Sequence, residues 1–182
     1  MWTVNDARGH ALASSAVGEI VGSDGLAYYA SDKNNLPSGV TAVAMIAYKS
    51  ETAGESLAIQ LNASPANMSW SDACNYSNYP SITGNPGTWR LPSKADWQNM
   101  FVGCAKSGDA GFSDEMNPIA GFKEKIGATG ITWQSDAPYW SSTGSESGAW
   151  FVSVYLDGGN AVAYFYEDDT SNPYYVLGCL AF

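Results

Sequence analysis

Few residues in this chain could do acid–base or nucleophilic chemistry, and they lie far apart. His10 is the only histidine, and the three cysteines, Cys74, Cys104 and Cys179, are all distant from it in sequence. A Cys–His or Ser–His pair would require the N-terminal segment to fold back onto one of these groups. The glycines occur in turn contexts and form no phosphate-binding or dinucleotide-binding loop. We therefore predict no catalytic residues and no cofactor, and a protein that is not an enzyme.

Carboxylates gather near the C-terminus and could ligate a hard cation. Glu167, Asp168 and Asp169 are consecutive, and Asp157 begins a glycine-rich turn before them. Oxygen ligands of this kind suit calcium, but a calcium-binding loop spaces them in a D-x-D-x-D-G pattern that this sequence lacks. These carboxylates could form a calcium site or a solvated acidic loop. The solvated loop is favoured, so we predict no metal site.

Aromatic side chains crowd the C-terminal third and are the remaining candidates for a functional surface. Ala149–Leu156 alternates between two faces, with Trp150, Val152 and Val154 on one and Phe151, Ser153 and Tyr155 on the other. Tyrosine covers a large area at little entropic cost and adds a hydroxyl, which suits a recognition surface. Aromatic residues also fill cores, so a second buried face is the alternative for each of them.

The segments before these aromatic strands begin with strands and then change to helices. Residues 1–25 indicate a lead-in strand and turns. The apolar run Val40–Tyr48 predicts a strand buried on both faces, with Ser56–Leu61 as its neighbour. Ser69 and Asp72 stand at the spacing of a cap before a short helix, with Trp70, Ala73 and Cys74 on one side of it.

Two further helices are predicted in the middle of the chain. Ser93 and Asp96 have capping-box spacing before a helix over Lys94–Lys106, and the apolar stripe of that helix is Trp97, Met100, Phe101 and Cys104. The next helix is predicted to use Asn117 as N-cap and Pro118 as its first residue, and to end at Gly127. Its inward residues would be Ile119, Phe122 and Ile126.

Strands are predicted again from Trp133 onward. The strand Ala149–Leu156 is followed by a turn at Asp157–Asn160, a return strand Ala161–Tyr166, a surface loop Glu167–Pro173 and a last strand Tyr174–Phe182. This order predicts an α+β fold, in which two or three helices from the middle of the chain pack against antiparallel sheets. At 182 residues, one domain over 1–182 is expected.

Composition excludes several classes of partner. The net charge of −10 and the pI near 4.2 repel phosphate backbones, so we expect no nucleic acid. No apolar run approaches the roughly 18 residues that span a bilayer, so direct membrane insertion is not expected. Met1–Val4 lacks a basic segment before an apolar one, which indicates a chain that starts inside a longer precursor. The odd cysteine count permits one disulfide with one thiol, or no disulfide.

Two motifs resemble one known group of proteins. Gly87–Trp97, GTWRLPSKADW, resembles the W-R-L-P-[ST]-x-x-[ED]-[WL] signature of C-type-lectin-fold proteins in the formylglycine-generating-enzyme-like and fibrobacter-major-paralogous groups. Tyr139–Thr143, YWSST, with Ala149–Trp150 after it, is similar to the second half of that signature. Val40–Tyr48 and Ser69–Cys74 look like the same group, so the resemblance covers nearly the whole chain and implies a C-type lectin fold.

The C-terminal residues resemble a smaller group of proteins within this fold. Val176–Phe182, VLGCLAF, is similar to the V-R-P-V-L-A-F ending of variable proteins of diversity-generating retroelements, and departs from it at Leu177, Gly178 and Cys179. In those proteins the C-terminal region, here 139–182, is rewritten by adenine-directed mutagenesis. The lone Cys179 does not reproduce the cysteine pair or metal site of formylglycine-generating enzymes. The Glu-Pro-Asn and Trp-Asn-Asp motifs of calcium-dependent sugar lectins are also missing.

The resemblance implies a diversified, ligand-binding surface whose residues alternate with the core. Trp150, Val152, Val154 and Val162 would stay in the core. The implied ligand-binding residues are Gly144, Glu146, Gly148, Phe151, Ser153, Tyr155, Leu156, Asp157, Ala163, Tyr164, Tyr166, Asp168 and Asp169.

From this we expect an adhesin-like domain on a cell surface, outside the cell or on a phage virion. It would recognise a protein or cell-surface ligand through these residues. The alternatives are an invariant structural or pilus-tip module of the same fold, and a metal-dependent lectin.

Overall fold

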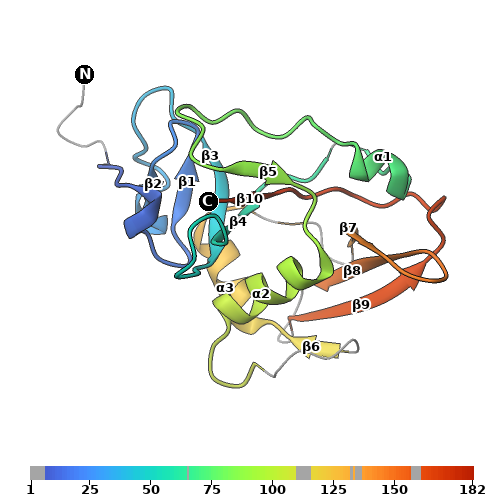
Figure 1. The fold of residues 1–182 in the computed structure, drawn as a ribbon. Coiled ribbons are helices and arrows are strands. Elements are labelled where there is room, and N and C mark those ends of the chain that lie inside the picture. The colour runs from blue at the N-terminus through green and yellow to red at the C-terminus, as the bar shows by residue number, and fades with distance from the viewer. Residues whose placement is uncertain (1–6, 65, 110–115, 132, 134–136, 157–160) are drawn as a thin grey trace.

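The fold is α+β, with two antiparallel sheets and three α-helices among the residues described (Figure 1). The computed structural model describes residues 7–64, 66–109, 116–131, 133, 137–156 and 161–182. No helix in these ranges is long and apolar enough to cross a membrane. The predicted lead-in over 1–25 contains a 3₁₀ turn, η1 at Leu12–Ser14, and the first strand; a second such turn, η2, follows at Ala30–Asp32.

The first sheet combines strands from both ends of the chain. Its strand order is β2-β1-β3-β4-β10-β5, and its described pairings are antiparallel. Its strands are β1 (Ile20–Gly22), β2 (Ala27–Tyr28), β3 (Ala42–Tyr48), β4 (Leu57–Gln60), β5 (Thr88–Arg90) and β10 (Cys179–Ala181). As the apolar run predicts, β3 is buried from residue 43 to residue 47 and pairs with β4.

The second sheet carries most of the aromatic C-terminal third. Its order is β6-β9-β8-β7, again antiparallel. Its strands are β6 (Met116–Pro118), β7 (Ala137–Gly144), β8 (Ala149–Tyr155) and β9 (Val162–Asp168). Glu167 and Asp168 therefore belong to β9, whereas the sequence prediction placed them in the following loop.

The short helix α1, Trp70–Cys74, begins where its capping signal predicts. The Ser69 hydroxyl accepts a hydrogen bond from the amide of Asp72. Ala73 is buried, but Cys74 is exposed, so the prediction that Cys74 shares the inward side of this helix is wrong. One turn of helix is too short for a periodic pattern to define which side faces the core.

The longer helix α2, Lys94–Cys104, has both hydrogen bonds of the predicted capping box. The Ser93 hydroxyl accepts from the Asp96 amide, and the Asp96 carboxylate accepts from the Ser93 amide. The helix ends two residues before the predicted Lys106. Its predicted stripe, Trp97, Met100, Phe101 and Cys104, is buried.

The third helix, α3, starts later than predicted, at Ala120, and continues to Ala128. Asn117 and Pro118 are not its cap and first residue but part of β6, where they pair with Ala163 and Val162 of β9. Proline is tolerated there because β6 is an edge strand.

The cap of α3 comes from a distant residue. The Asp109 carboxylate accepts from the amides of Ala120 at 3.0 Å and Gly121 at 2.9 Å. A carboxylate at a helix N-terminus satisfies free amides and favours the helix dipole, so it replaces the missing local cap. Ile119, Phe122 and Ile126 are buried as predicted, and Gly127 lies inside the helix instead of ending it.

The last segment does not form one strand over Tyr174–Phe182 as predicted, and only Cys179–Ala181 is a strand, β10. Tyr174 and Tyr175 make only isolated bridges, to Met68 and to Tyr139 of β7. The chain then crosses to the first sheet, where β10 lies between β4 and β5. Without β10, the facing edges of β4 and β5 would have unpaired backbone N–H and C=O groups, and β10 provides their hydrogen-bond partners.

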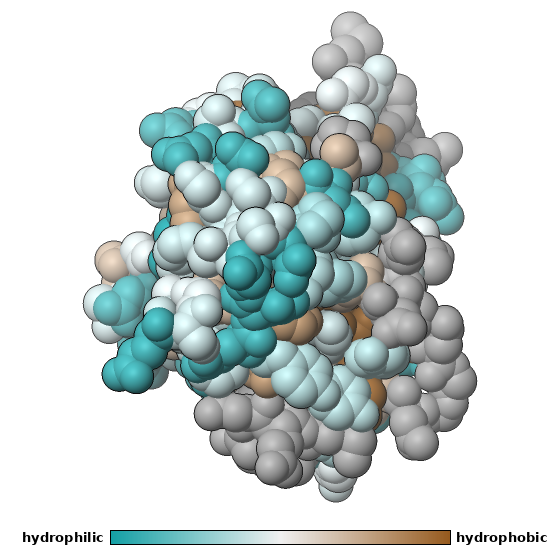
Figure 2. Space-filling view, turned by 90° about the vertical axis from the view of Figure 1, so that its right-hand side faces the viewer, coloured by the Kyte–Doolittle hydropathy of each residue, from teal (hydrophilic) through white to brown (hydrophobic). Residues whose placement is uncertain are grey.

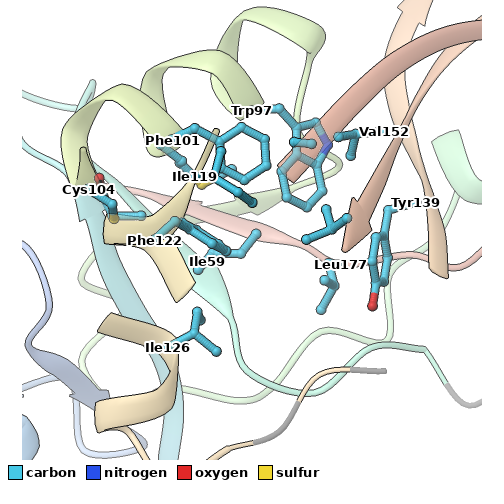
Figure 3. Packing of buried hydrophobic residues seen from close by; sticks show 14 of the residues in the cluster. Ile59, Trp97, Phe101, Cys104, Ile119, Phe122, Ile126, Tyr139, Val152 and Leu177 are labelled. Carbon is cyan, nitrogen blue, oxygen red and sulfur yellow. Dashed lines mark hydrogen bonds between the residues drawn. The ribbon is translucent and has the colours of Figure 1, made fainter. Parts of the chain in front are cut away.

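A single large core joins the two sheets and the two longer helices (Figure 3). Helix α2 contacts β3 and β4 on one side and β7 and β8 on the other. Phe101 packs edge-on against Phe122 of α3 at 4.9 Å between ring centroids. Val152 of β8 and Leu177 of the C-terminal segment complete the same cluster. This core fixes the orientation of the second sheet, so one face of that sheet is buried against α2.

Candidate functional site

The register of β8 and β9 separates the second sheet into two faces. Val152 pairs with Phe165 and Val154 pairs with Ala163, and all four side chains are buried in the main core. The neighbouring pairs, Phe151 with Tyr166 and Ser153 with Tyr164, therefore point to the opposite face. The alternation predicted for β8 from its sequence is thus present.

Two residues of β9 lie on the opposite faces from those expected from the sequence. Ala163 was expected on the ligand-binding face and Val162 in the core, but Ala163 is fully buried and Val162 is half-buried on the other face. The small alanine fits directly opposite Val154, inside a tightly packed core. Because side chains alternate with a period of two, Val162 and Ala163 exchange faces, whereas Tyr164 and Tyr166 lie on the outward face as expected.

Four rings form a continuous row on the outward side of β8 and β9, which we call the aromatic face: Phe151, Tyr155, Tyr164 and Tyr166. Ring centroids are 5.4 Å apart for Tyr155 and Tyr164, 5.9 Å for Tyr164 and Tyr166, and 5.7 Å for Tyr166 and Phe151. The rings of Tyr164 and Tyr166 are nearly parallel, at 8°. Tyr166 is 48% exposed, which makes it one of the most exposed large apolar residues described.

Ser153 lies in the sheet beneath this row and is only 9% exposed. It is opposite Tyr164, so the rings cover its side chain. Ser153 is therefore on the predicted face but contributes little surface while the tyrosines are present.

One end of the aromatic face is anchored by buried groups. The Tyr174 ring lies 4.6 Å from both Phe151 and Trp140, measured between ring centroids. Trp140 is fully buried, and its indole N–H donates to the carbonyl of Met68 at 2.9 Å. Trp70 of α1 donates to the carbonyl of Ser141 at 2.8 Å and holds the same end of β7. These contacts fix the position of Phe151 without covering the tyrosines.

A carboxylate network continues the aromatic face beyond Tyr166. Asp168 accepts hydrogen bonds from the Tyr174 hydroxyl and from the amide of Asp169. These donors lower the pKa of Asp168, the Tyr174 hydroxyl most. Burial and the Asp168 carboxylate together raise the pKa of Tyr174 to about 12. Asp168 is therefore ionised, and Tyr174 keeps its proton, at neutral pH.

Asp169 caps the turn that follows β9. Its carboxylate accepts from the amide of Ser171 at 2.8 Å and from the hydroxyl of Ser171 at 2.7 Å, which lowers its pKa. Within the residues described, no group of three His, Cys, Asp or Glu side chains is placed to hold a metal. Asp157, the fourth carboxylate of the predicted cluster, lies outside the described residues.

The β7–β8 hairpin contains three more of the predicted residues, and they differ in the space around them. Gly144 and Glu146 are exposed, and a Cβ atom on Gly144 would make ordinary contacts, the nearest with the Trp70 ring at 3.5 Å. A Cβ atom on Gly148 would lie 2.0 Å from the backbone carbonyl oxygen of Asp168. Gly148 is thus required by the close approach of two backbones and cannot serve as a freely variable position.

Two side chains at the border of β8 belong to the core side. Leu156 is half-buried and packs against the main core. Trp150 is also half-buried, and the Lys94 ammonium lies over its ring, 3.2 Å from the centroid. Trp150 therefore remains a core-side residue, as predicted.

Tyr174 and Trp140 complete the site but were not among the predicted site residues. The signal in the sequence that could have identified them is their aromatic residue type. The alternation of side chains along a strand could not assign them to the site. Tyr174 lies in an irregular segment, and Trp140 lies on the outward side of a strand that residues distant in sequence cover.

The surface around the site is mostly polar. Figure 2 faces the side on which α1, β7, β8 and β9 lie in Figure 1, and pale and teal residues prevail there. Two cavities of about 340 Å³ lie elsewhere, one beside Lys49 and Phe182 and the other beside Arg90 and Asp96.

No family model, curated protein or solved structure matches this chain.

Proposed function

We propose that this protein is a ligand-binding, receptor-recognition domain whose contact surface is the aromatic face. The observation that carries the proposal is the row of Phe151, Tyr155, Tyr164 and Tyr166 on a sheet whose other face is buried. Large rigid rings on a fixed backbone lose little entropy on binding, which is what a recognition surface requires.

We further propose that the fold is a C-type lectin fold and that the chain is a variable protein of a diversity-generating retroelement. The two halves of the motif that suggested this group, 87–97 and 139–143, lie side by side. The amide of Ser142 donates to the carbonyl of Pro92 at 2.8 Å, and the amide of Lys94 donates to the Thr143 hydroxyl at 2.9 Å. Residues far apart in sequence thus form one unit that supports the end of β7.

Such a protein would act outside the cell, on a cell surface or on a phage virion, where it would recognise a protein or cell-surface ligand. It would do no catalysis. The side chains exchanged between variants would be those of the aromatic face together with Ser153, Asp168, Asp169 and the exposed hairpin residues Gly144 and Glu146. Ala163 and Leu156 leave this set because they pack in or against the core, and Gly148 leaves it because of a close backbone contact.

The experiment that tests the proposal is deep sequencing of the native gene across a population. We expect amino-acid differences at Phe151, Tyr155, Tyr164 and Tyr166, and almost none at four internal control positions on the same strands. The controls are Val152, Val154, Ala163 and Phe165. A reverse transcriptase gene and a near-copy template differing mainly at adenines should lie beside the gene.

Differences spread evenly over both faces of β8 and β9 would contradict the proposal. They would favour the alternative, an invariant structural module whose aromatic row only stabilises the sheet. Differences confined to a cavity away from the aromatic face would point to a different binding site.

A further inference from the structure

We propose that the aromatic face binds a basic protein segment, with an Arg or Lys side chain lying along Tyr166 and its charged group at Asp168. This inference rests on the proposed function and adds the chemical class of the partner. It combines three features of the described residues: the geometry of β9, the hydrogen bonds of Asp168 and the distribution of charge along the chain.

The geometry places rings and a carboxylate in one line. Tyr164, Tyr166 and Asp168 alternate along β9 and so share a face, with successive positions about 6.8 Å apart because an antiparallel strand rises about 3.4 Å per residue. Phe151 lies beside Tyr166 in the neighbouring strand, and the Tyr174 hydroxyl donates to Asp168. An extended Arg or Lys stem can cover Tyr166 while its cationic group reaches Asp168.

The hydrogen bonds hold the Asp168 carboxylate in place but leave its charge intact. Its donors are the Tyr174 hydroxyl, the Asp169 amide and the Asn172 side chain, and all of them are neutral. A carboxylate can accept about four hydrogen bonds, so there is room for a charged donor. Because the carboxylate is already positioned, a cation loses less free energy in ordering it on binding.

The charged residues in the C-terminal part of the sequence have one sign. Residues 126–182 contain Asp136, Glu146, Asp157, Glu167, Asp168 and Asp169, and no Lys or Arg. Opposite charges steer partners together and exclude partners of like charge, so an acidic surface selects a basic partner. The chain already uses the same contact on the other face of the sheet, where Lys94 lies over Trp150.

The test is a selection of displayed random short peptides on the folded protein. Peptides that also bind the Tyr164→Ser, Tyr166→Ser double variant are removed, so that those retained depend on the aromatic face. We expect the retained peptides to be enriched in Arg and Lys relative to the starting library. In nuclear magnetic resonance spectra, the side-chain protons of a bound Arg should show contacts to the Tyr166 ring.

A pair of charge variants then locates the cation. Asp168→Asn should weaken binding of a selected peptide about tenfold, the size expected for loss of one well-placed charge–charge hydrogen bond. Glu51→Gln is the matched control, since it removes the same charge from an exposed position in the turn between β3 and β4. It should leave the affinity unchanged. Glu51→Gln should unfold at the wild-type temperature, whereas Asp168→Asn loses a stabilising charge and should unfold somewhat below it while staying folded at the temperature of the binding assay.

The outcomes separate this inference from the proposed function. Peptides that depend on the aromatic face but show no excess of Arg or Lys would overturn the inference and leave the proposed function standing. Equal weakening of peptide binding by Asp168→Asn and Glu51→Gln would also overturn it, because the peptide would then be attracted by the net negative charge of the protein and not by Asp168. Peptides that all bind the double variant as well as wild type would overturn both.

Discussion

Truncating two adjacent residues of β9 tests whether the second sheet has one structural face and one free face. Phe165 is 2% exposed and packs edge-on against Phe101 at 6.3 Å between centroids. Phe165→Ala should lower the free energy of unfolding by about 3–5 kcal/mol, the usual cost of emptying a buried phenylalanine site. Tyr166, the next residue, is 48% exposed, and its ring packs against those of Tyr164 and Phe151.

The expected loss for Tyr166→Ala is much smaller. Complete burial of a large side chain is worth about 1.5–3 kcal/mol, and roughly half of the Tyr166 side chain is buried. A cross-strand aromatic pair adds about 0.2–1 kcal/mol. The sum predicts a loss of about 1–2.5 kcal/mol, below that for Phe165→Ala.

The assay is urea unfolding followed by tryptophan fluorescence, with Val102→Ala as the control. Val102 is 53% exposed on α2, so its truncation should change the unfolding free energy by less than about 0.5 kcal/mol. If Tyr166→Ala proves as costly as Phe165→Ala, the aromatic row is a second core and the reasoning that makes it a binding surface fails.

Three further predictions concern the surroundings of this sheet. Gly148→Ala should lower the free energy of unfolding by about 1–3 kcal/mol, because its Cβ would overlap the Asp168 carbonyl oxygen, whereas Gly144→Ala should be nearly neutral; equal effects would contradict the close backbone approach. Tyr174→Phe should raise the pKa of Asp168 toward the ordinary value of about 3.9, as followed by carboxyl-carbon resonances. The pKa of Asp168 is lowered in the folded state, so its contribution to stability is present above the unfolded-state pKa and is lost as the pH falls. The variant lacks part of this contribution and should therefore lose less stability below about pH 4. An unchanged dependence of stability on pH in this range would refute this. Exposed Cys74 should react with an aromatic disulfide reagent in the native protein at mildly alkaline pH, whereas Cys104 and Cys179, whose thiol pKa burial raises to about 12, should react only after unfolding.

Local signals in the sequence were sufficient for the elements that depend on near neighbours. The capping box at Ser93 and Asp96 and the apolar spacing after it located α2 and its buried stripe. The apolar run before Tyr48 identified β3, and alternation identified both faces of β8. Each of these signals acts within about one or two turns of helix, or along one strand, so it can be recognised without knowing the partner.

Other features depended on partners distant in sequence. Asn117 and Pro118 carry the local signature of a helix start, yet pairing with β9 makes them a strand, and Asp109 caps the helix instead. The C-terminal segment likewise reaches the first sheet because the edges of β4 and β5 lack partners there.

The candidate site shows the same division between sequence and tertiary structure. The crowding of aromatic residues in the sequence pointed to Phe151, Tyr155, Tyr164 and Tyr166 as candidates, and the family resemblance added Asp168. Only the register across the sheet decided that Ala163 faces the core and Val162 does not. Only the fold brought Tyr174 to Asp168 and the Asp168 backbone against Gly148, since the chain must fold before groups distant in sequence can meet.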